Sequence, residues 1–175
     1  MFDLFMDTMA PTDSTTILDI GTSEKETREA NILEKLYPWP SQITCASLGS
    51  GAAITAAHPD VRHVPIEPGQ KLPFGDCEFD IAYSNAVLEH VGGSERRRVF
   101  LLEAQRVSRA IFVLVPNRWF PVEHHTGIPF LHWSPTWFRR TLKNGPRSYW
   151  SRVENLDFLS ASLLRYEWPL NRPIS

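Results

Sequence analysis

The sequence has few cysteines and no long apolar run, and each absence removes a class of protein. Its two cysteines, Cys45 and Cys77, lack the spacing of metal ligands and form no C-x-x-C motif. A reducing, cytoplasmic location therefore fits both cysteines better than a disulfide framework does. No stretch of about 18 uninterrupted apolar residues occurs, so the sequence predicts no transmembrane segment.

Positive charge is also scarce. The chain has 18 Lys and Arg against 20 Asp and Glu, a formal net charge of -2 at pH 7. Without a basic excess, binding to nucleic acid or to an anionic membrane surface is not expected. The run from Arg96 to Arg98 is a local exception. A solvated helix face is the favoured interpretation of that run, and a phosphate site is the alternative.

Three nucleotide-related motifs are missing. A dinucleotide fingerprint needs G-x-G-x-x-G, but Gly21 is followed by Thr22-Ser23-Glu24-Lys25-Glu26, and no G-K-[ST] marks a P-loop. The N-P-P-[YF] motif of base-flipping methyltransferases is replaced by Asn85-Ala86-Val87-Leu88. Because the acids after Gly21 would repel phosphate, we predict a ligand without phosphates at that turn, and no nucleic-acid partner.

What the sequence does contain is a series of short apolar runs bounded by turn residues, which predict buried strands. They cover Thr16 to Ile20, Ile43 to Leu48, Phe79 to Ser84, Ala110 to Val115 and, more weakly, Val61 to Ile66. Helical segments lie between them. Asn31 with Glu34 resembles a capping pair at the start of one helix, and Ser94 is predicted to cap another.

The second of these helices has an amphipathic pattern. Its predicted core face holds Val99, Leu102 and Val107, and its predicted solvent face holds Arg96, Arg97 and Glu103. Nearly continuous apolar strands that alternate with helices indicate a mostly parallel sheet with helices on both faces. We therefore predict one Rossmann-like, doubly wound α/β domain over residues 1–175. Residues 1–15 would dock on its core, and residues 116–150, rich in aromatic residues and histidine, would form a lid.

Ligands of an open parallel sheet bind beyond the carboxyl ends of its strands, so the residues that follow the strands are the candidates for a binding site. Gly21 has a clear physical use there, because a residue without Cβ lets a ligand approach the backbone. The residues expected to face one crevice are Asp19, Gly21, Thr22, Ser47, Leu48, Glu67, Asn85 and Ala86.

Three segments resemble a known family in their order and spacing. They are "TTILDIG", "KLPFGDCEFDIAYSNAVLEHVG" and "AIFVLVPNRWFPVEHHTGIPFLHW". Together they resemble class I S-adenosylmethionine-dependent methyltransferases, in particular the small type 11 domains, and Leu72 to His90 is the strongest element. The resemblance implies S-adenosylmethionine as cofactor and methyl transfer as reaction. A catalytically inactive binding or scaffold module is the alternative.

Site residues follow from the resemblance, position by position. Asp19 would lie near the methionine amino group and Gly21 against the cofactor. Asn85 and Ala86 would border the methionine end, and His90 would orient the pocket or cap its helix.

The chain departs from the family pattern in three places. Ser23 stands at the second glycine, Ser47 stands where an acid usually holds the ribose, and Pro68 replaces an adenine-binding acid, with Glu67 one position earlier. A neutral Ser47 would weaken cofactor binding by about 1–2 kcal/mol without abolishing it.

Histidines after the fifth predicted strand are the candidate proton acceptors. His124 and His125 have the residue type for removing a proton from an acceptor hydroxyl, because the unperturbed pKa of histidine is about 6.5. The alternative is a structural role in a proline-rich loop. Glu123, His124, His125 and His132 do not form a recognised zinc spacing, so no metal is predicted.

The acceptor and the partners are the least specified. Trp119, Phe120, Phe130 and Trp133 would either stack on a sugar or pack in the core under a lid. We expect a small-molecule or glycan acceptor. Family members usually end in two antiparallel strands, whereas here a short helical pattern from Ser160 to Leu164 and one edge strand from Tyr166 to Leu170 are all that fit. The final strands are therefore expected to be reduced, or a partner chain or second copy covers the sheet edge.

Overall fold

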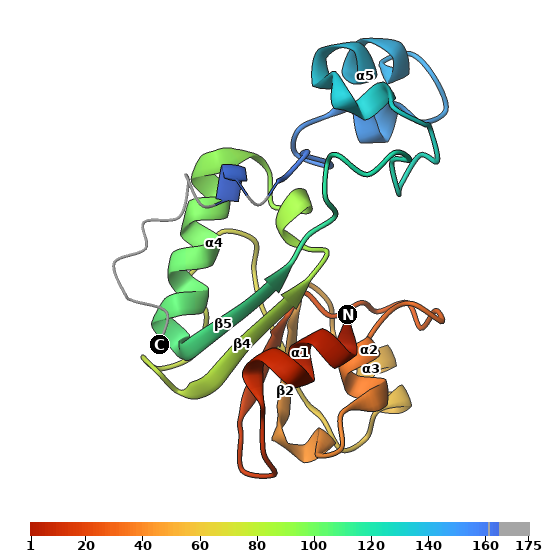
Figure 1. Ribbon diagram of the computed structural model, residues 1–175. Coiled ribbons are helices and arrows are strands. Elements are labelled where there is room, and N and C mark those ends of the chain that lie inside the picture. The colour runs from red at the N-terminus through yellow and green to blue at the C-terminus, as the bar shows by residue number, and fades with distance from the viewer. Residues whose placement is uncertain (161, 165–175) are drawn as a thin grey trace. The chain divides into compact units, whose positions relative to one another are not determined.

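The computed structural model describes residues 1–160 and 162–164, and within it the chain forms two compact units. The sheet unit comprises Met1–Asn85 and Leu102–Val113, and the second unit comprises Ala86–Leu101 and Leu114–Ser175. Figure 1 shows the helices and strands of both. The expectation of a single domain stays a prediction.

A five-stranded sheet forms the centre of the sheet unit, in the order β3-β2-β1-β4-β5. β1 pairs in parallel with β2 and with β4, and β2 pairs in parallel with β3. β4 and β5 lie side by side and run in the same direction (Figure 1). The strands are β1 (Ile17–Ile20), β2 (Ile43–Ser47), β3 (Arg62–Pro65), β4 (Phe79–Asn85) and β5 (Ser108–Leu114).

The position of each strand explains its burial. Every residue of β1 and β2 is buried, whereas none of the four residues of the edge strand β3 is. An apolar run without alternation is what a strand covered on both faces requires. The predicted Rossmann-like α/β fold is confirmed, and the five strands lie where the apolar runs place them.

The sheet unit also contains short helices. They are α1 (Phe2–Met9), α2 (Ile32–Leu36), the 3-10 turn η1 (Pro40–Gln42) and α3 (Ala52–Ala57). Phe5 of α1 is fully buried, and its ring lies 5.2 Å from that of Tyr83 and 5.3 Å from that of Phe112. The N-terminal segment thus attaches to the sheet through an aromatic cluster.

The predicted capping pair at α2 is wrong. Asn31 has a left-handed backbone, with φ of 52°, and its side chain makes no cap. Its amide instead bonds the backbone of Ser23, accepting from N and donating to O, both at 2.9 Å. Glu34 is buried rather than turned back to the helix start. Asn31 therefore closes the loop after β1.

The predicted faces of α4 (Gly93–Val107) are right for the buried Val107 and the exposed Arg96 but wrong at three other positions. Val99 and Leu102 are 37% and 41% exposed, whereas Arg97 is buried with Leu101, Ala104 and Val107. Positions 97, 101 and 104 share one helix face, so the inward stripe includes a charge. The Arg97 guanidinium pairs with the carboxylate of Asp157, which explains its burial. Ser94 lies inside the helix and not at its cap.

The second unit has a small apolar core and little regular structure. Its elements are η2 (Leu88–His90), η3 (Leu131–Trp133), α5 (Pro135–Leu142) and η4 (Ser148–Ser151). Phe138, Leu142, Leu156 and Phe158 form the core. Of residues 116–160, none belongs to a strand of the sheet, and an isolated bridge joins Val122 to Pro129.

Part of the C-terminal prediction lies outside the described residues, namely the edge strand from Tyr166 to Leu170. The short helical pattern is observed at residues 162–164. Among residues 1–160 and 162–164, no helix has the length and apolar character needed to cross a membrane.

Candidate cofactor site and histidine cluster

The carboxyl end of β1 carries a buried pair of acids. Asp19 of β1 and Glu34 of α2 are both buried, and the two carboxyl groups interact electrostatically. The Cys45 thiol, from β2, donates to Glu34 Oε1 at 3.2 Å. Burial and the nearby Glu34 carboxyl raise the pKa of Asp19 well above its ordinary value. Burial beside Glu34 therefore favours the neutral form of Asp19.

The turn that follows is shaped for a close ligand contact. Gly21 has a φ of 101°, a left-handed conformation that a side chain would strain, and its N–H donates to Ala46 O at 2.7 Å. The Thr22 hydroxyl is buried beside the Cys45 thiol and has no hydrogen bond of its own within the described residues. A buried polar atom without a partner is costly unless a ligand satisfies it.

Two polar side chains lie at the end of β2. The predicted Ser47 hydroxyl is buried and bonds His63 Nε2 at 2.9 Å, and Leu48 is exposed. A carboxylate from the β1 loop lies there too, because Glu24 Oε1 accepts from the N–H of Gly51 at 2.6 Å. A Cβ at Gly49 would lie only 2.4 Å from the same oxygen, so Gly49 keeps this space open for Glu24.

Glu24 is thus a candidate residue that sequence reasoning missed. Its negative charge argues against a phosphate ligand, but the sequence around Glu24 does not indicate that its side chain reaches the end of a second strand. The one available signal is Gly49, which comes shortly after β2 and makes room for a carboxylate.

The remaining predicted cofactor residues divide between the units. Glu67 is exposed in the turn after β3, and Asn85 is half-buried at the end of β4. Ala86 belongs to the second unit, where it is exposed with a φ of 55° and donates to Leu114 O at 2.9 Å. Their roles toward a cofactor stay predictions.

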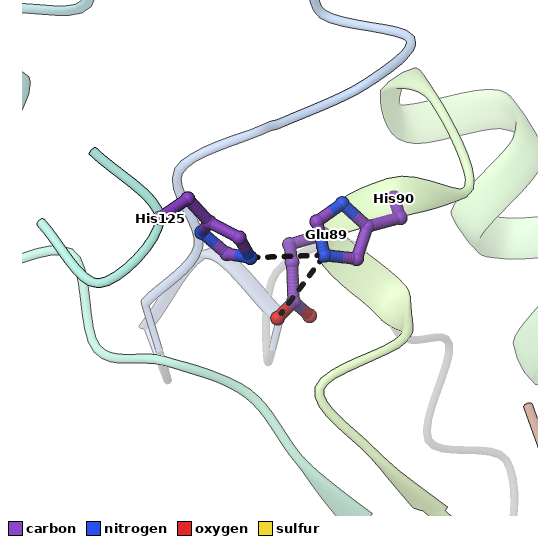
Figure 2. Close-up of side chains that lie close together, drawn as sticks. All are labelled: Glu89, His90 and His125. Atoms are coloured by element: carbon purple, nitrogen blue, oxygen red, sulfur yellow. Dashed lines mark hydrogen bonds and ion pairs between the residues drawn. The ribbon is translucent and has the colours of Figure 1, made fainter. Parts of the chain in front are cut away.

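In the second unit, two neighbouring side chains of η2 meet one from a distant loop, and we name Glu89, His90 and His125 the histidine cluster (Figure 2). Their ligand atoms all lie within 4.8 Å of one another. His125 Nε2 lies 3.2 Å from His90 Nε2, and Glu89 Oε1 lies 3.9 Å from that His90 atom.

Outer groups fix both imidazole rings. His90 Nδ1 donates to the backbone oxygen of Asn155 at 2.6 Å, and His125 Nδ1 donates to Glu123 Oε1 at 2.9 Å. Burial would raise the pKa of Glu123, but hydrogen bonds from His125 and Thr126 lower it to about 2. Glu123 is therefore a carboxylate, and it orients His125.

Glu89 is the acidic member of the cluster and has no hydrogen-bond partner for either carboxyl oxygen within the described residues. It is 1% exposed, and burial raises its pKa to about 7. Burial also lowers the pKa of His90. Burial thus disfavours both the negative charge on Glu89 and the positive charge on His90.

Two other histidines of the predicted lid are not in the cluster. His124 is exposed, and the buried His132 bonds the Phe120 oxygen through Nε2 at 2.9 Å. The aromatic residues Trp119, Phe120, Phe130 and Trp133 are exposed. The core-packing interpretation of those four is therefore wrong.

Comparison with known proteins decides the family. The type 11 methyltransferase family, described as "Methyltransferase domain", matches residues 18–111, more than half of the chain. The chain belongs to this family. Its cofactor is S-adenosylmethionine, and it is a methyltransferase, as the resemblance implies. No functionally curated protein matches the chain.

Solved structures agree on the fold. A SAM-dependent methyltransferase from Methanosarcina mazei is 17% identical, with a TM-score of 0.60 over 93% of this chain and 81% of that one. YcgJ from Bacillus subtilis gives 15% identity and a TM-score of 0.57 over 94% and 64%, respectively. A SAM-dependent methyltransferase from Thermotoga maritima is 16% identical, with a TM-score of 0.57 over 95% of this chain and 67% of that one. The chain thus spans less than two thirds of the Bacillus protein.

Proposed function

We propose that this chain transfers the methyl group of S-adenosylmethionine to a hydroxyl of a small molecule or glycan, with the cofactor held at the carboxyl ends of β1 and β2. The observation that carries the proposal is the turn at Gly21 and Thr22. It offers an open backbone approach and a buried hydroxyl that lacks a partner. Both features fit a ligand that brings its own hydrogen-bonding groups.

Glu24 fits the ribose of that cofactor. Its carboxylate lies at the end of β2, held by the N–H of Gly51. A carboxylate has lone pairs to spare after one such bond, so it can still accept from ribose hydroxyls. Charge-assisted hydrogen bonds are about twice as strong as neutral ones, which suits Glu24 better than the occupied Ser47 hydroxyl.

The protein's part in the chemistry is placement. The bound sulfonium supplies the electrophilic methyl group, so the chain has to orient the acceptor and exclude water. His124 and His125 remain the predicted proton acceptors for a hydroxyl. A small-molecule or glycan acceptor is supported by the exposed aromatic residues, among which Phe130 and Trp133 lie 5.0 Å apart and Trp119 and Trp133 6.4 Å apart.

Calorimetry with S-adenosylmethionine and S-adenosylhomocysteine tests the cofactor site. We expect micromolar binding of both, and a weaker interaction in Thr22→Val, which removes the unpartnered hydroxyl at nearly constant shape. In the free protein Thr22→Val should be neutral or stabilising by about 1 kcal/mol, because no bond is lost. Absence of heat at millimolar ligand would favour the alternative of a binding module without catalysis.

A further inference from the structure

In the histidine cluster, the two imidazole nitrogens that carry lone pairs lie next to each other. Both Nδ1 atoms donate to groups that can only accept, the Asn155 carbonyl and the Glu123 carboxylate. Each Nδ1 therefore carries its hydrogen. A neutral imidazole has one N–H, so both Nε2 atoms carry lone pairs, and these atoms lie 3.2 Å apart.

Two lone pairs at that distance repel each other unless a cation lies between them. Glu89 also needs a partner, because its carboxyl group is buried beside the two rings without a hydrogen bond within the described residues. A proton on one ring would satisfy the two nitrogens but leave Glu89 without a bond. A metal ion can accept from all three groups at once.

From this arrangement we propose that Glu89, His90 and His125 bind one divalent transition-metal ion such as Zn²⁺. The site goes beyond methyl transfer and does not depend on it. Two nitrogens bound to Zn²⁺ at about 2.0–2.1 Å in a tetrahedron lie about 3.3 Å apart, close to the observed spacing. Glu89 Oε1 lies 3.9 Å from His90 Nε2, so a small rotation of the carboxylate completes the set.

The surroundings resemble those of metal-binding histidines in general. Such histidines donate their second N–H to a carboxylate or a backbone carbonyl, which fixes the ring and raises its basicity. His125 uses Glu123 and His90 uses Asn155 in this way. Trp150 lies against both rings, with centroid distances of 4.7 Å to His125 and 6.0 Å to His90.

Three protein ligands leave a fourth position on the metal. In zinc sites that position takes water or a substrate oxygen, and sites with two histidines and one glutamate are of this open type. The ligand class expected there is an oxygen donor, such as a hydroxyl or carboxylate. With the metal bound, His125 is a ligand, and His124 remains as the predicted proton acceptor for methyl transfer.

Zinc titration of the full chain against a chromophoric chelator tests the site. We expect one Zn²⁺ per chain and an affinity at least about 100-fold lower in His90→Gln, His125→Gln and Glu89→Gln. Glu123→Gln, which only loosens the ring of His125, should lower it by about 10- to 100-fold. His58→Gln is the matched control, because His58 bonds one carboxylate, Glu26, at 3.2 Å and has no part in the cluster.

Two further measurements test the site even if a histidine variant unfolds. Glu89→Gln removes a buried charge that has no hydrogen bond in the described structure, so it should fold and yet lose the rise in melting temperature that Zn²⁺ gives the native chain. Long-range ¹H–¹⁵N spectra should show both Nε2 signals shifting with Zn²⁺. Equal zinc affinity in the native chain and Glu89→Gln, or an Nε2 proton that Zn²⁺ does not displace, would overturn the site.

Discussion

Both units bury carboxyl groups, but they satisfy them in different ways. In the sheet unit Asp19 lies beside a second acid, Glu34, and its raised pKa favours the neutral carboxyl group. In the second unit Glu89 faces two imidazole nitrogens, and Asp157 faces the Arg97 guanidinium. The same type of side chain thus calls for a proton, a metal ion or an arginine, depending on its neighbour.

The largest change in stability is expected at Arg97. Arg97→Ala should destabilise the second unit by about 2–4 kcal/mol, because it removes a buried side chain and leaves the half-buried Asp157 carboxylate with the more distant Arg139, at 3.5 Å. Urea unfolding followed by tryptophan fluorescence measures this. The exposed neighbour Arg98 is the control, and Arg98→Ala should stay within about 0.5 kcal/mol. Equal effects of the two substitutions would mean that the buried pair contributes nothing.

The acid pair of the sheet unit should respond to pH in the opposite sense to an ordinary salt bridge. The folded-state pKa of Asp19 is raised, so its stabilising contribution is complete below its unfolded pKa, about 3.9, and is lost as pH rises through the folded value. Asp19→Asn removes the titrating group. The variant should therefore be about 1–3 kcal/mol more stable than the native chain at pH 8, with little difference at pH 4.

Thermal unfolding across that pH range provides the measurement. The exposed Asp13 offers a matched control, and Asp13→Asn should leave the pH profile unchanged. A native profile parallel to that of Asp19→Asn from pH 4 to 8 would show that Asp19 is not held protonated by Glu34.

Strand positions were predictable because burial on both faces leaves a local signature, an apolar run bounded by turns. The faces of α4 were not, since Arg97 is inside only because Asp157 lies 60 positions away to pair with it. His90 and His125 are likewise separated by 35 positions. Local spacing led to Glu123, His124, His125 and His132, of which His125 alone is in the cluster. Polar contacts between distant segments leave no periodic trace.

A smaller effect is expected at Gly49, where the β2 loop makes room for Glu24. Gly49→Ala places a Cβ 2.4 Å from Glu24 Oε1 and should push the carboxylate away from Gly51. We expect about 10-fold weaker S-adenosylmethionine binding, or about 1.4 kcal/mol, measured by calorimetry. Gly75→Ala is the control, because its Cβ would meet only Glu78 at an ordinary 3.5 Å. Unchanged affinity in Gly49→Ala would remove Glu24 from the cofactor site.

The smallest expected effect sharpens the comparison within one sheet, at Asp80 of β4. Hydrogen bonds from the Thr16 N–H and hydroxyl, at 3.0 and 2.9 Å, lower the pKa of Asp80, whereas burial beside Glu34 raises that of Asp19. The contribution of Asp80 is therefore present above its unfolded pKa and lost as pH falls through the folded value. Because Asp80 is partly exposed, Asp80→Asn should cost only about 0.5 kcal/mol at pH 7. The stability difference between Asp80→Asn and the native chain should also change with pH in the opposite direction to that of Asp19→Asn. The reason is that the fold favours the charged form of Asp80 and the neutral form of Asp19.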